Sequence, residues 1–260
     1  MTVILKEFKL IKDSLDAYLD EVVACSSFLE RSLDLRPHIY TMLDNNALDD
    51  SKRELVNSFY SHSDLRIDLT HRSVYASNAA YFENFIRKIA IAAIKIQNRK
   101  KIKVEKAKVK LIDENIYRSG QALSSIRSPH TYHKFDHSSI ADAILNNADN
   151  TKELILHPEA LVINAGSTTD KNIENLFARG DIIINWDNLC KKSELSNFFS
   201  IKGPRETSKE TKLRLNNMVE HRNRIAHQGA SASDIEYQDL NDQIKFISAF
   251  STDLLKFLSL

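Results

Sequence analysis

Arg222, Asn223 and His227 could together bind a phosphate group and transfer protons to or from a reacting group beside it. Asn223 and His227 lie four residues apart, which would place both side chains on one face of a helix. Arg222 would lie about 140° around the same helix from His227, but its long side chain can reach toward the same cleft. One helix end would therefore present an amide, a permanent positive charge and an acid–base group.

Arg222 also occupies a position where an apolar residue is expected. The apolar stripe of its helix runs through Leu215 and Met218 and resumes at Ile225. A guanidinium on a buried face needs a partner or a ligand. Arginine can hold a phosphate through two hydrogen bonds, and histidine can transfer protons near neutral pH. This combination fits RNA cleavage by 2′-hydroxyl attack, which needs no metal and leaves a 2′,3′-cyclic phosphate and a 5′-hydroxyl.

The spacing of this arginine and histidine is weak evidence by itself. In a chain of this composition, an arginine five residues before a histidine is expected by chance about half of the time. A second copy runs from Arg66 to His71, but it lacks a polar residue after the arginine and a following glycine. The copy that ends at His227 has both. Asn223 follows its arginine, and Gly229 comes shortly after its histidine as a natural helix end. We interpret the earlier copy as a coincidence.

Two strings resemble the signatures of a known family. MVEHRNRIAHQG at residues 218–229 resembles the signature helix of HEPN proteins, where an arginine and a polar residue precede a histidine at the end of the penultimate helix. AAYFENFI at residues 79–86 resembles the second signature of the RiboL-PSP-type subgroup, an aromatic–glutamate pair on a long helix. By this resemblance, Glu83 would lie near Arg222 and orient it.

The resemblance also implies a fold, an activity and partners. It implies an all-α, HEPN-like antiparallel helical bundle, here with an elaborated middle insertion. It further implies a homodimer in which the motifs of both protomers face one cleft, and an RNA substrate cut by an endoribonuclease. Such enzymes act as toxins or antiphage effectors, with an antitoxin or another defence protein as a possible partner. Other members have lost catalysis and only bind RNA or a protein, and that alternative stays open.

Other interpretations remain for the individual residues. Arg222, Asn223 and His227 could form a polar cluster that ties two helices together. Glu83 could instead pair with a basic neighbour on its own helix, Arg87 or Lys88. Residues that flank the motif or form a basic run could contact the RNA backbone, although such a run is usually a solvated surface. These candidate RNA-binding residues are His221, Arg224, Arg99, Lys100, Lys101 and Lys103.

Three histidines in the middle of the chain have a spacing that could hold zinc. His130, His133 and His137 are followed or preceded at short intervals by Asp136 and several serines. The flanking Ser and Pro residues favour a loop, where polar histidines are common. We therefore expect no metal and no cofactor, with a metal-dependent hydrolase as the alternative.

The apolar periodicity predicts the elements that must position these residues. Helices are expected at residues 3–35, 52–60, 69–98, 138–147, 171–179 and 207–229, and again from about 233 to the end. The sequence Thr207-Ser208-Lys209-Glu210 is typical of a helix start, and Ser233-Asp234-Ile235-Glu236 of another. A short exposed strand is possible at 101–111. We expect one domain over 1–260, composed of a helical hairpin at 1–98, a basic segment and insertion at 99–206, and the motif helix and last helix at 207–260.

The composition agrees with a helical globular protein. Among 260 residues only five are Gly and four are Pro, which favours long helices over strands joined by tight turns. Cys25 and Cys190 are too few for a disulfide framework. The most apolar run, at residues 89–94, is far too short to span a bilayer, and the first residues lack the apolar core of a signal peptide. A cytoplasmic protein is the expectation.

Overall fold

The structure is a computed structural model that describes residues 2–34, 51, 54, 63–125, 136–191, 193–228 and 235–259. Within these residues the elements are helices, apart from an isolated bridge between Lys103 and Glu153. The prediction of an all-α fold is confirmed. None of the described helices is both long enough and apolar enough to cross a membrane.

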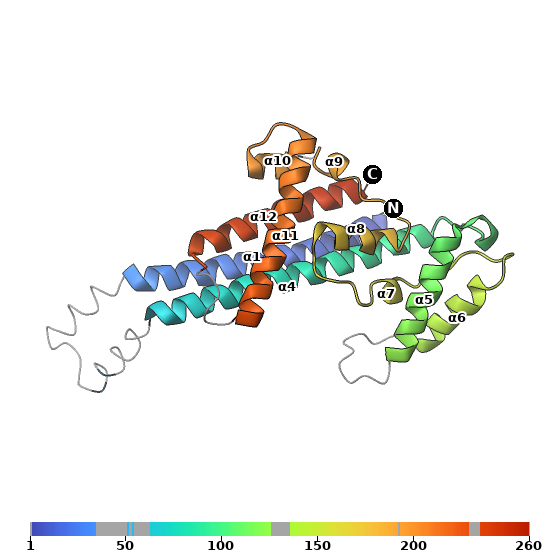
Figure 1. Ribbon diagram of the computed structural model, residues 1–260, viewed down its shortest axis with the longest axis horizontal. Coiled ribbons are helices and arrows are strands. Elements are labelled where there is room, and N and C mark those ends of the chain that lie inside the picture. The colour runs from blue at the N-terminus through green and yellow to red at the C-terminus, as the bar shows by residue number, and fades with distance from the viewer. Residues whose placement is uncertain are drawn as a thin grey trace.

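Two long helices form the base of the molecule. α1 spans Thr2–Asp34, and α4 spans Ser63–Asn98 and lies alongside it (Figure 1). Apolar side chains recur on α1 every three, four or seven residues, so that they share one face and are buried against the bundle. These are Phe8, Leu15, Leu19 and Val22. The helices expected at 3–35 and 69–98 are therefore present, the second one starting six residues earlier.

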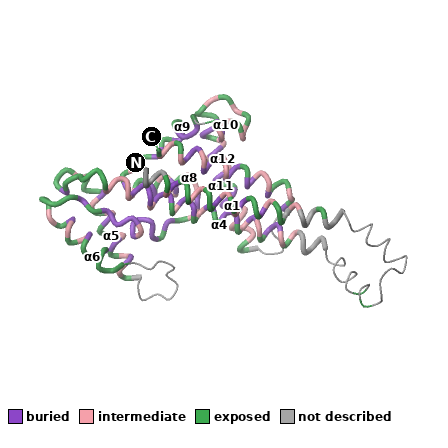
Figure 2. Tube along the Cα trace, turned by 180° about the vertical axis from the view of Figure 1, so that it is seen from behind, coloured by how far each residue is buried: buried purple, intermediate pink, exposed green. Residues whose placement is uncertain are grey.

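Two more helices pack on this pair. α12, Tyr237–Leu258, contacts both α1 and α4, whereas α11, Pro204–Gln228, crosses α4 steeply (Figure 1). Figure 2 shows that buried residues are concentrated where α4, α8, α11 and α12 meet. This crossing is what brings the end of the motif helix over the middle of α4.

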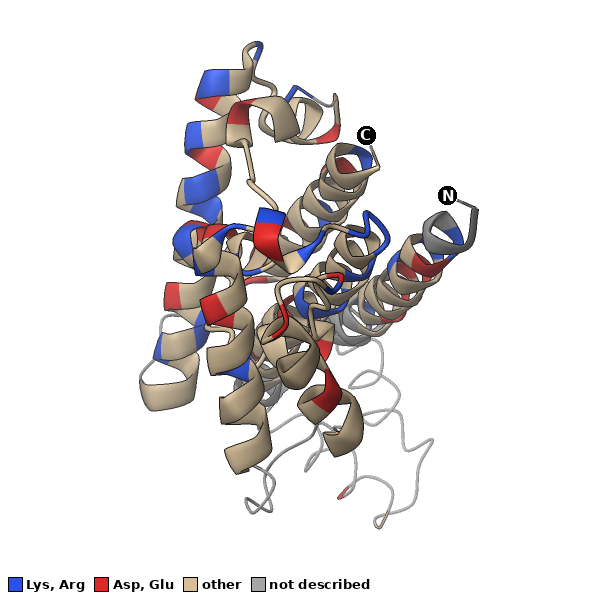
Figure 3. Ribbon diagram, turned by 90° about the vertical axis from the view of Figure 1, so that its right-hand side faces the viewer, with Lys and Arg blue, Asp and Glu red and all other residues tan. Residues whose placement is uncertain are grey.

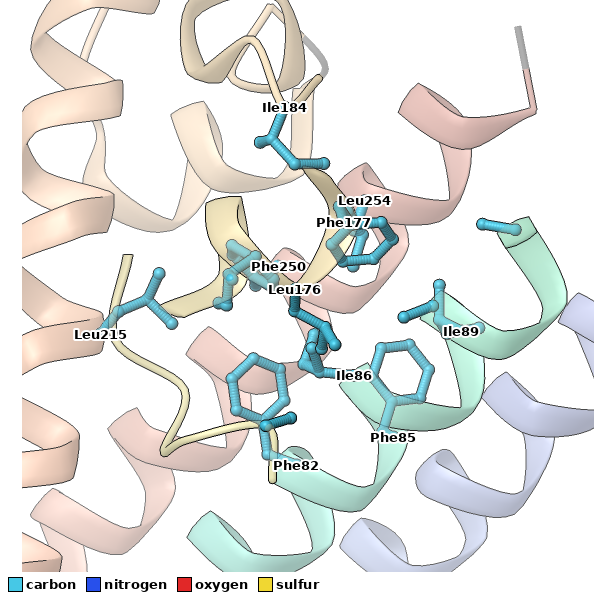
Figure 4. Close-up of a cluster of buried hydrophobic side chains, with 14 of the residues drawn as sticks. Phe82, Phe85, Ile86, Ile89, Leu176, Phe177, Ile184, Leu215, Phe250 and Leu254 are labelled. Atoms are coloured by element: carbon cyan, nitrogen blue, oxygen red, sulfur yellow. The ribbon is translucent and has the colours of Figure 1, made fainter. Parts of the chain in front are cut away.

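An aromatic and aliphatic core fixes these helices relative to one another. Phe82 of α4 packs edge-on against Phe250 of α12, with ring centroids 5.5 Å apart and an interplanar angle of 84° (Figure 4). Leu215 of α11 belongs to the same cluster and is fully buried. Each such side chain contributes about 1.5–3 kcal/mol when it leaves water, so the core holds the motif helix firmly against α4.

The middle of the chain forms helices that are all shorter than the four described above. They are η1 (Val104–Lys106), α5 (Val109–Ser125), α6 (His137–Asn147), α7 (Pro158–Leu161), α8 (Asp170–Ala178), α9 (Trp186–Leu189) and α10 (Ser193–Phe199). The helices expected at 138–147 and 171–179 correspond to α6 and α8. The possible strand at 101–111 was wrong, because this stretch contains η1 and the start of α5. α8, α9 and α10 bury Phe177, Trp186 and Leu195 in the main core, so this segment is part of the bundle.

Two predicted helix starts were also wrong. α11 begins at Pro204, where proline is well suited to the first helical turn, so Thr207 lies inside the helix. Its hydroxyl donates to the carbonyl of Gly203 at 2.8 Å. α12 begins at Tyr237, with Glu236 as the N-cap and Asp239 completing a capping box. Gly229 and nearly all of the helix expected near 52–60 lie outside the described residues.

Candidate functional site

Arg222 of α11 forms an ion pair with Glu83 of α4. A terminal guanidinium nitrogen of Arg222 donates to Oε2 of Glu83 at 3.2 Å, across 139 positions of sequence. The Glu83 side chain is 17% exposed and that of Arg222 31%, so both are partly shielded and still open to a ligand. The charged residue in the apolar stripe of α11 thus has its partner, as the resemblance implied.

Glu83 has a second cationic partner on its own helix. Arg87, one turn further along α4, donates to Oε1 of Glu83 at 2.5 Å and to the carbonyl of Ala165 at 3.1 Å. The two interpretations of Glu83, as a neighbour of Arg87 and as a partner of Arg222, are therefore both realised. Two guanidiniums share one carboxylate, which leaves an excess positive charge that an anion would neutralise.

The segment before α8 is a part of the site that the sequence analysis missed, whereas Arg87 was expected there only as an alternative partner of Glu83. A small cleft beside Glu83 and Arg87 is lined by Gly166, Ser167 and Asn172, among others. The spacing of Glu83 and Arg87, one helical turn apart, indicated their ion pair. No sequence pattern indicated the contact with residue 165, because it depends on how the middle segment folds back over α4.

The other two motif residues do not join this ion-pair cluster. Asn223 is half-buried, whereas His227 is exposed near the end of α11. His227 is five residues beyond Arg222, which corresponds to about 7.5 Å along the helix and 140° around it. Among the described residues, no hydrogen bond or ion pair links either side chain to Arg222. Within one chain, therefore, the structure brings together Arg222 and Glu83 and leaves His227 at the surface.

His221 and Arg224 lie on another part of α11 and pack toward α4 and α12. The ring of His221 is 6.0 Å from that of the buried Tyr75, and burial lowers the pKa of His221 below its usual 6.5. Burial likewise raises the pKa of Tyr75 to about 12. Arg224 lies 3.8 Å from Glu220. This placement supports a packing role for His221, while its expected contact with RNA stays a prediction.

The basic run is distant from the Glu83–Arg222 pair. Arg99, Lys100, Lys101 and Lys103 are all exposed at and beyond the end of α4. Arg99 is sixteen residues beyond Glu83, which corresponds to about 24 Å along a helix. If these residues contact RNA, they do so as a separate surface, so their role stays a prediction.

His71, the histidine of the earlier arginine–histidine copy, has a structural role. His71 is buried, and its Nδ1 lies 3.0 Å from the carbonyl oxygen of Ile235, just before α12. The neighbouring Arg72 pairs with Asp68 at 2.8 Å. His71 therefore connects α4 to the chain entering α12, a packing role that agrees with our interpretation of that copy as a coincidence.

The histidine cluster of the middle segment lies partly outside the described residues. His130 and His133 are not described, and His137 is exposed at the start of α6. Asp136 is the N-cap of α6, where it accepts hydrogen bonds from the backbone N–H and the hydroxyl of Ser138, and these bonds lower its pKa. Among the described side chains, no group of His, Cys, Asp and Glu has an arrangement that could hold a metal ion.

Comparison with known proteins gives one match. The sequence model of the family described as RiboL-PSP-HEPN matches residues 43–259, a range that includes both α4 and α11. No curated protein and no solved structure matches the chain. The matched range contains Glu83, Arg222 and His227, so the ion pair described above lies within the part of the chain that the family shares.

Proposed function

This chain belongs to the RiboL-PSP-HEPN family, and on that premise we propose that it is a metal-independent endoribonuclease. HEPN domains are generally related to ribonucleases, although some are non-catalytic. The single observation that carries the proposal is the ion pair between Arg222 and Glu83, which holds a guanidinium at a partly open position on the same helix as the motif's histidine. A fixed guanidinium with a spare face is suited to a phosphate oxygen.

The proposed reaction divides the work among four side chains. His227 accepts the proton of the ribose 2′-hydroxyl, whose oxygen then forms a bond to the adjacent phosphorus. The bond from phosphorus to the 5′-oxygen breaks, and that oxygen takes up a proton from the protonated His227 or from water, which leaves a 2′,3′-cyclic phosphate and a 5′-hydroxyl. Arg222 binds the phosphate and balances the charge that grows on it, and Asn223 positions the phosphate or the histidine. Glu83 is a positioning residue that acts through Arg222.

RNA cleavage in the presence of EDTA tests the proposal directly. Purified protein should cut single-stranded or loop-containing RNA. The new 3′ ends should not be substrates for a ligase that needs a 3′-hydroxyl until the cyclic phosphate has been removed. His227→Ala and Arg222→Ala should each abolish cleavage. The matched control is His137→Ala, which removes an exposed histidine from α6. Cleavage that EDTA stops, or that survives His227→Ala, would contradict the proposal.

We further propose that the active unit is a homodimer with a composite site. The exposed position of His227, without a bond to Arg222 in its own chain, supports this. If Arg222 of one protomer works with His227 of its partner, mixing the two inactive variants restores one intact site in each mixed dimer. About a quarter of wild-type activity should then return after random exchange of subunits. If both residues act within one chain, mixing restores nothing, and the composite site is rejected.

The main alternative is a non-catalytic module that binds RNA or a partner protein. Induction of the protein in cells separates the two, because an active nuclease of a toxin or antiphage system should slow growth. Arg222→Ala should relieve that effect, and RNA from the induced cells should carry new cyclic-phosphate ends. Binding of RNA without turnover, in wild type and variant alike, would favour the module.

A further inference from the structure

A groove of about 450 Å³ lies between α5 and α8, apart from the Glu83–Arg222 pair. Its α5 side carries Lys110, Glu114 and Arg118, and its α8 side carries Asn175 and Arg179. Figure 3 views the molecule from the end at which α5 and α6 lie and marks the charged residues there. The volume is within the range of small-molecule sites, which is about 300–1,000 Å³.

Two arginines of the groove share a single carboxylate. Arg118 donates from Nε to Oε1 of Glu114 at 2.8 Å, and Nε of Arg179 lies 3.8 Å from the same oxygen. Their side chains are only 18% and 12% exposed. Burial and the neighbouring charge of Arg118 both lower the pKa of Arg179, while Glu114 opposes them. Two guanidiniums thus share one carboxylate, which leaves one positive charge here without a carboxylate of its own.

Lysines add to the positive charge at the mouth of the groove. Lys108 pairs with Asp181 at 2.6 Å, whereas Lys110 has no ion pair with any residue that the structure describes. The lining thus holds four cations against two carboxylates, an excess of two positive charges. A phosphate monoester carries a charge of about −1.5 to −2 at neutral pH, which matches that excess, whereas a single carboxylate does not.

The lining also offers apolar surface beside the charges. Leu111 lies on the α5 side, and Ile183, which is 76% exposed, lies at the opposite side. An exposed isoleucine next to a cationic groove suits a ligand that has an apolar ring as well as a phosphoryl group. Nη1 of Arg179 donates to the carbonyls of Leu161 and Ile163, and Nη1 of Arg118 donates to Oε1 of Gln121, so the other terminal nitrogen of each guanidinium is the donor left for a phosphoryl oxygen.

We propose that this groove binds the phosphate monoester of a nucleotide, carried either by a free nucleotide or by the 5′ end of a nucleic acid. The proposal is independent of RNA cleavage at Arg222. It gives a role to Lys108 and Lys110, which the proposed cleavage site leaves unexplained. α8 separates the two places, because Asn172 and Ile173 line the cleft beside Glu83 while Asn175 and Arg179 line the groove.

Calorimetric titration of the full chain with matched ligands tests the proposal. Adenosine 5′-monophosphate is compared with adenosine, and a short DNA oligonucleotide with a 5′-phosphate is compared with its 5′-hydroxyl form, since DNA lacks the 2′-hydroxyl needed for cleavage. Each phosphorylated ligand that binds should do so at least about tenfold more tightly than its partner. Binding of both phosphorylated ligands identifies the phosphate as the feature recognised, and binding of the oligonucleotide alone identifies a nucleic-acid end.

Charge variants place that binding in the groove. Lys110→Glu and Asn175→Asp alter exposed residues on opposite sides of the groove, and each should weaken binding by about three- to tenfold. Lys106→Glu and Asn188→Asp make the same changes at exposed positions outside the lining and should alter Kd by less than about twofold. Equal binding with and without phosphate, no binding of either phosphorylated ligand, or equal effects of groove and control variants would each overturn the proposal.

Discussion

Glu83 accepts hydrogen bonds from two guanidiniums, through Oε2 from Arg222 at 3.2 Å and through Oε1 from Arg87 at 2.5 Å. One carboxylate thereby links α11, α4 and, through the contact of Arg87 with the carbonyl of Ala165, the segment before α8. Because Arg222 is held from one side, its remaining donors are available to a ligand. The orientation of the motif arginine thus depends on a residue on a different helix.

Replacing Glu83 by glutamine should impair cleavage more than folding. The neutral amide no longer fixes Arg222, and we expect the single-turnover rate to fall by between about ten- and a hundredfold. The free energy of unfolding should fall by only about 1–2 kcal/mol, because the ion pairs are partly exposed. Rates at saturating RNA and urea unfolding measure the two effects. Glu220→Gln on α11 is the control, and equal rates for both variants would refute the positioning role of Glu83.

Replacing His71 and replacing His227 should have opposite effects: the first should lower stability, and the second should abolish cleavage. His71→Ala removes the buried contact with the carbonyl of Ile235, and we expect a loss of about 1–3 kcal/mol of stability. Its cleavage rate per folded molecule should stay within about twofold of wild type. His227→Ala should keep its stability and lose cleavage, because that side chain is exposed. A folded His71→Ala protein without activity would contradict our assignment of the motif.

His157 should make the protein less stable in mild acid. Its Nδ1 accepts a hydrogen bond from the backbone N–H of Ala160 at 3.2 Å, and burial lowers its pKa below the usual 6.5, although Glu159 opposes the shift. The unfolded chain then binds more protons than the folded chain as the pH falls below about 6.5, so stability declines there. His157→Asn retains an N-cap without this titration.

Unfolding free energies at pH 7 and pH 5 measure the effect. The wild type should lose about 1 kcal/mol more than His157→Asn over this interval, because the protonated imidazole can no longer cap α7. Equal losses in the two proteins would show that His157 does not contribute to the acid sensitivity.

Asp253 should contribute strongly to stability where α12 packs against the start of α10. Its fully buried carboxylate accepts from the backbone N–H of Leu195 at 2.9 Å and of Glu194 at 3.4 Å, at the start of α10. Asp253→Ala leaves these donors without an acceptor, and we expect a loss of about 2–4 kcal/mol in urea unfolding. Asp242→Ala, on the same helix, should change stability by less than about 0.5 kcal/mol. Similar losses in both variants would disprove the role.

Much of the helical framework could be predicted from the sequence because it depends on local patterns. The apolar spacing along α1 and α4 predicts their amphipathic faces, and the few glycines and prolines allow long helices. Helix starts were less predictable, because a capping pattern such as Thr207–Glu210 can lie inside a helix when a proline begins it earlier. The short helices α7, α9 and α10 have too few residues to show a period of their own.

The sequence by itself determined the helical class and the motif helix, in which Arg222 occupies a position of the apolar stripe. It also led to the expectation that Glu83 would lie near Arg222. Only the tertiary structure decided that Glu83 binds both Arg87 and Arg222, that the buried His71 contacts the carbonyl of Ile235, and that the basic run lies far from Glu83. The physical reason is that helix periodicity is a property of neighbours within a few residues. Contacts between helices depend instead on crossing angles and on core packing, as between Phe82 and Phe250, which no local pattern encodes.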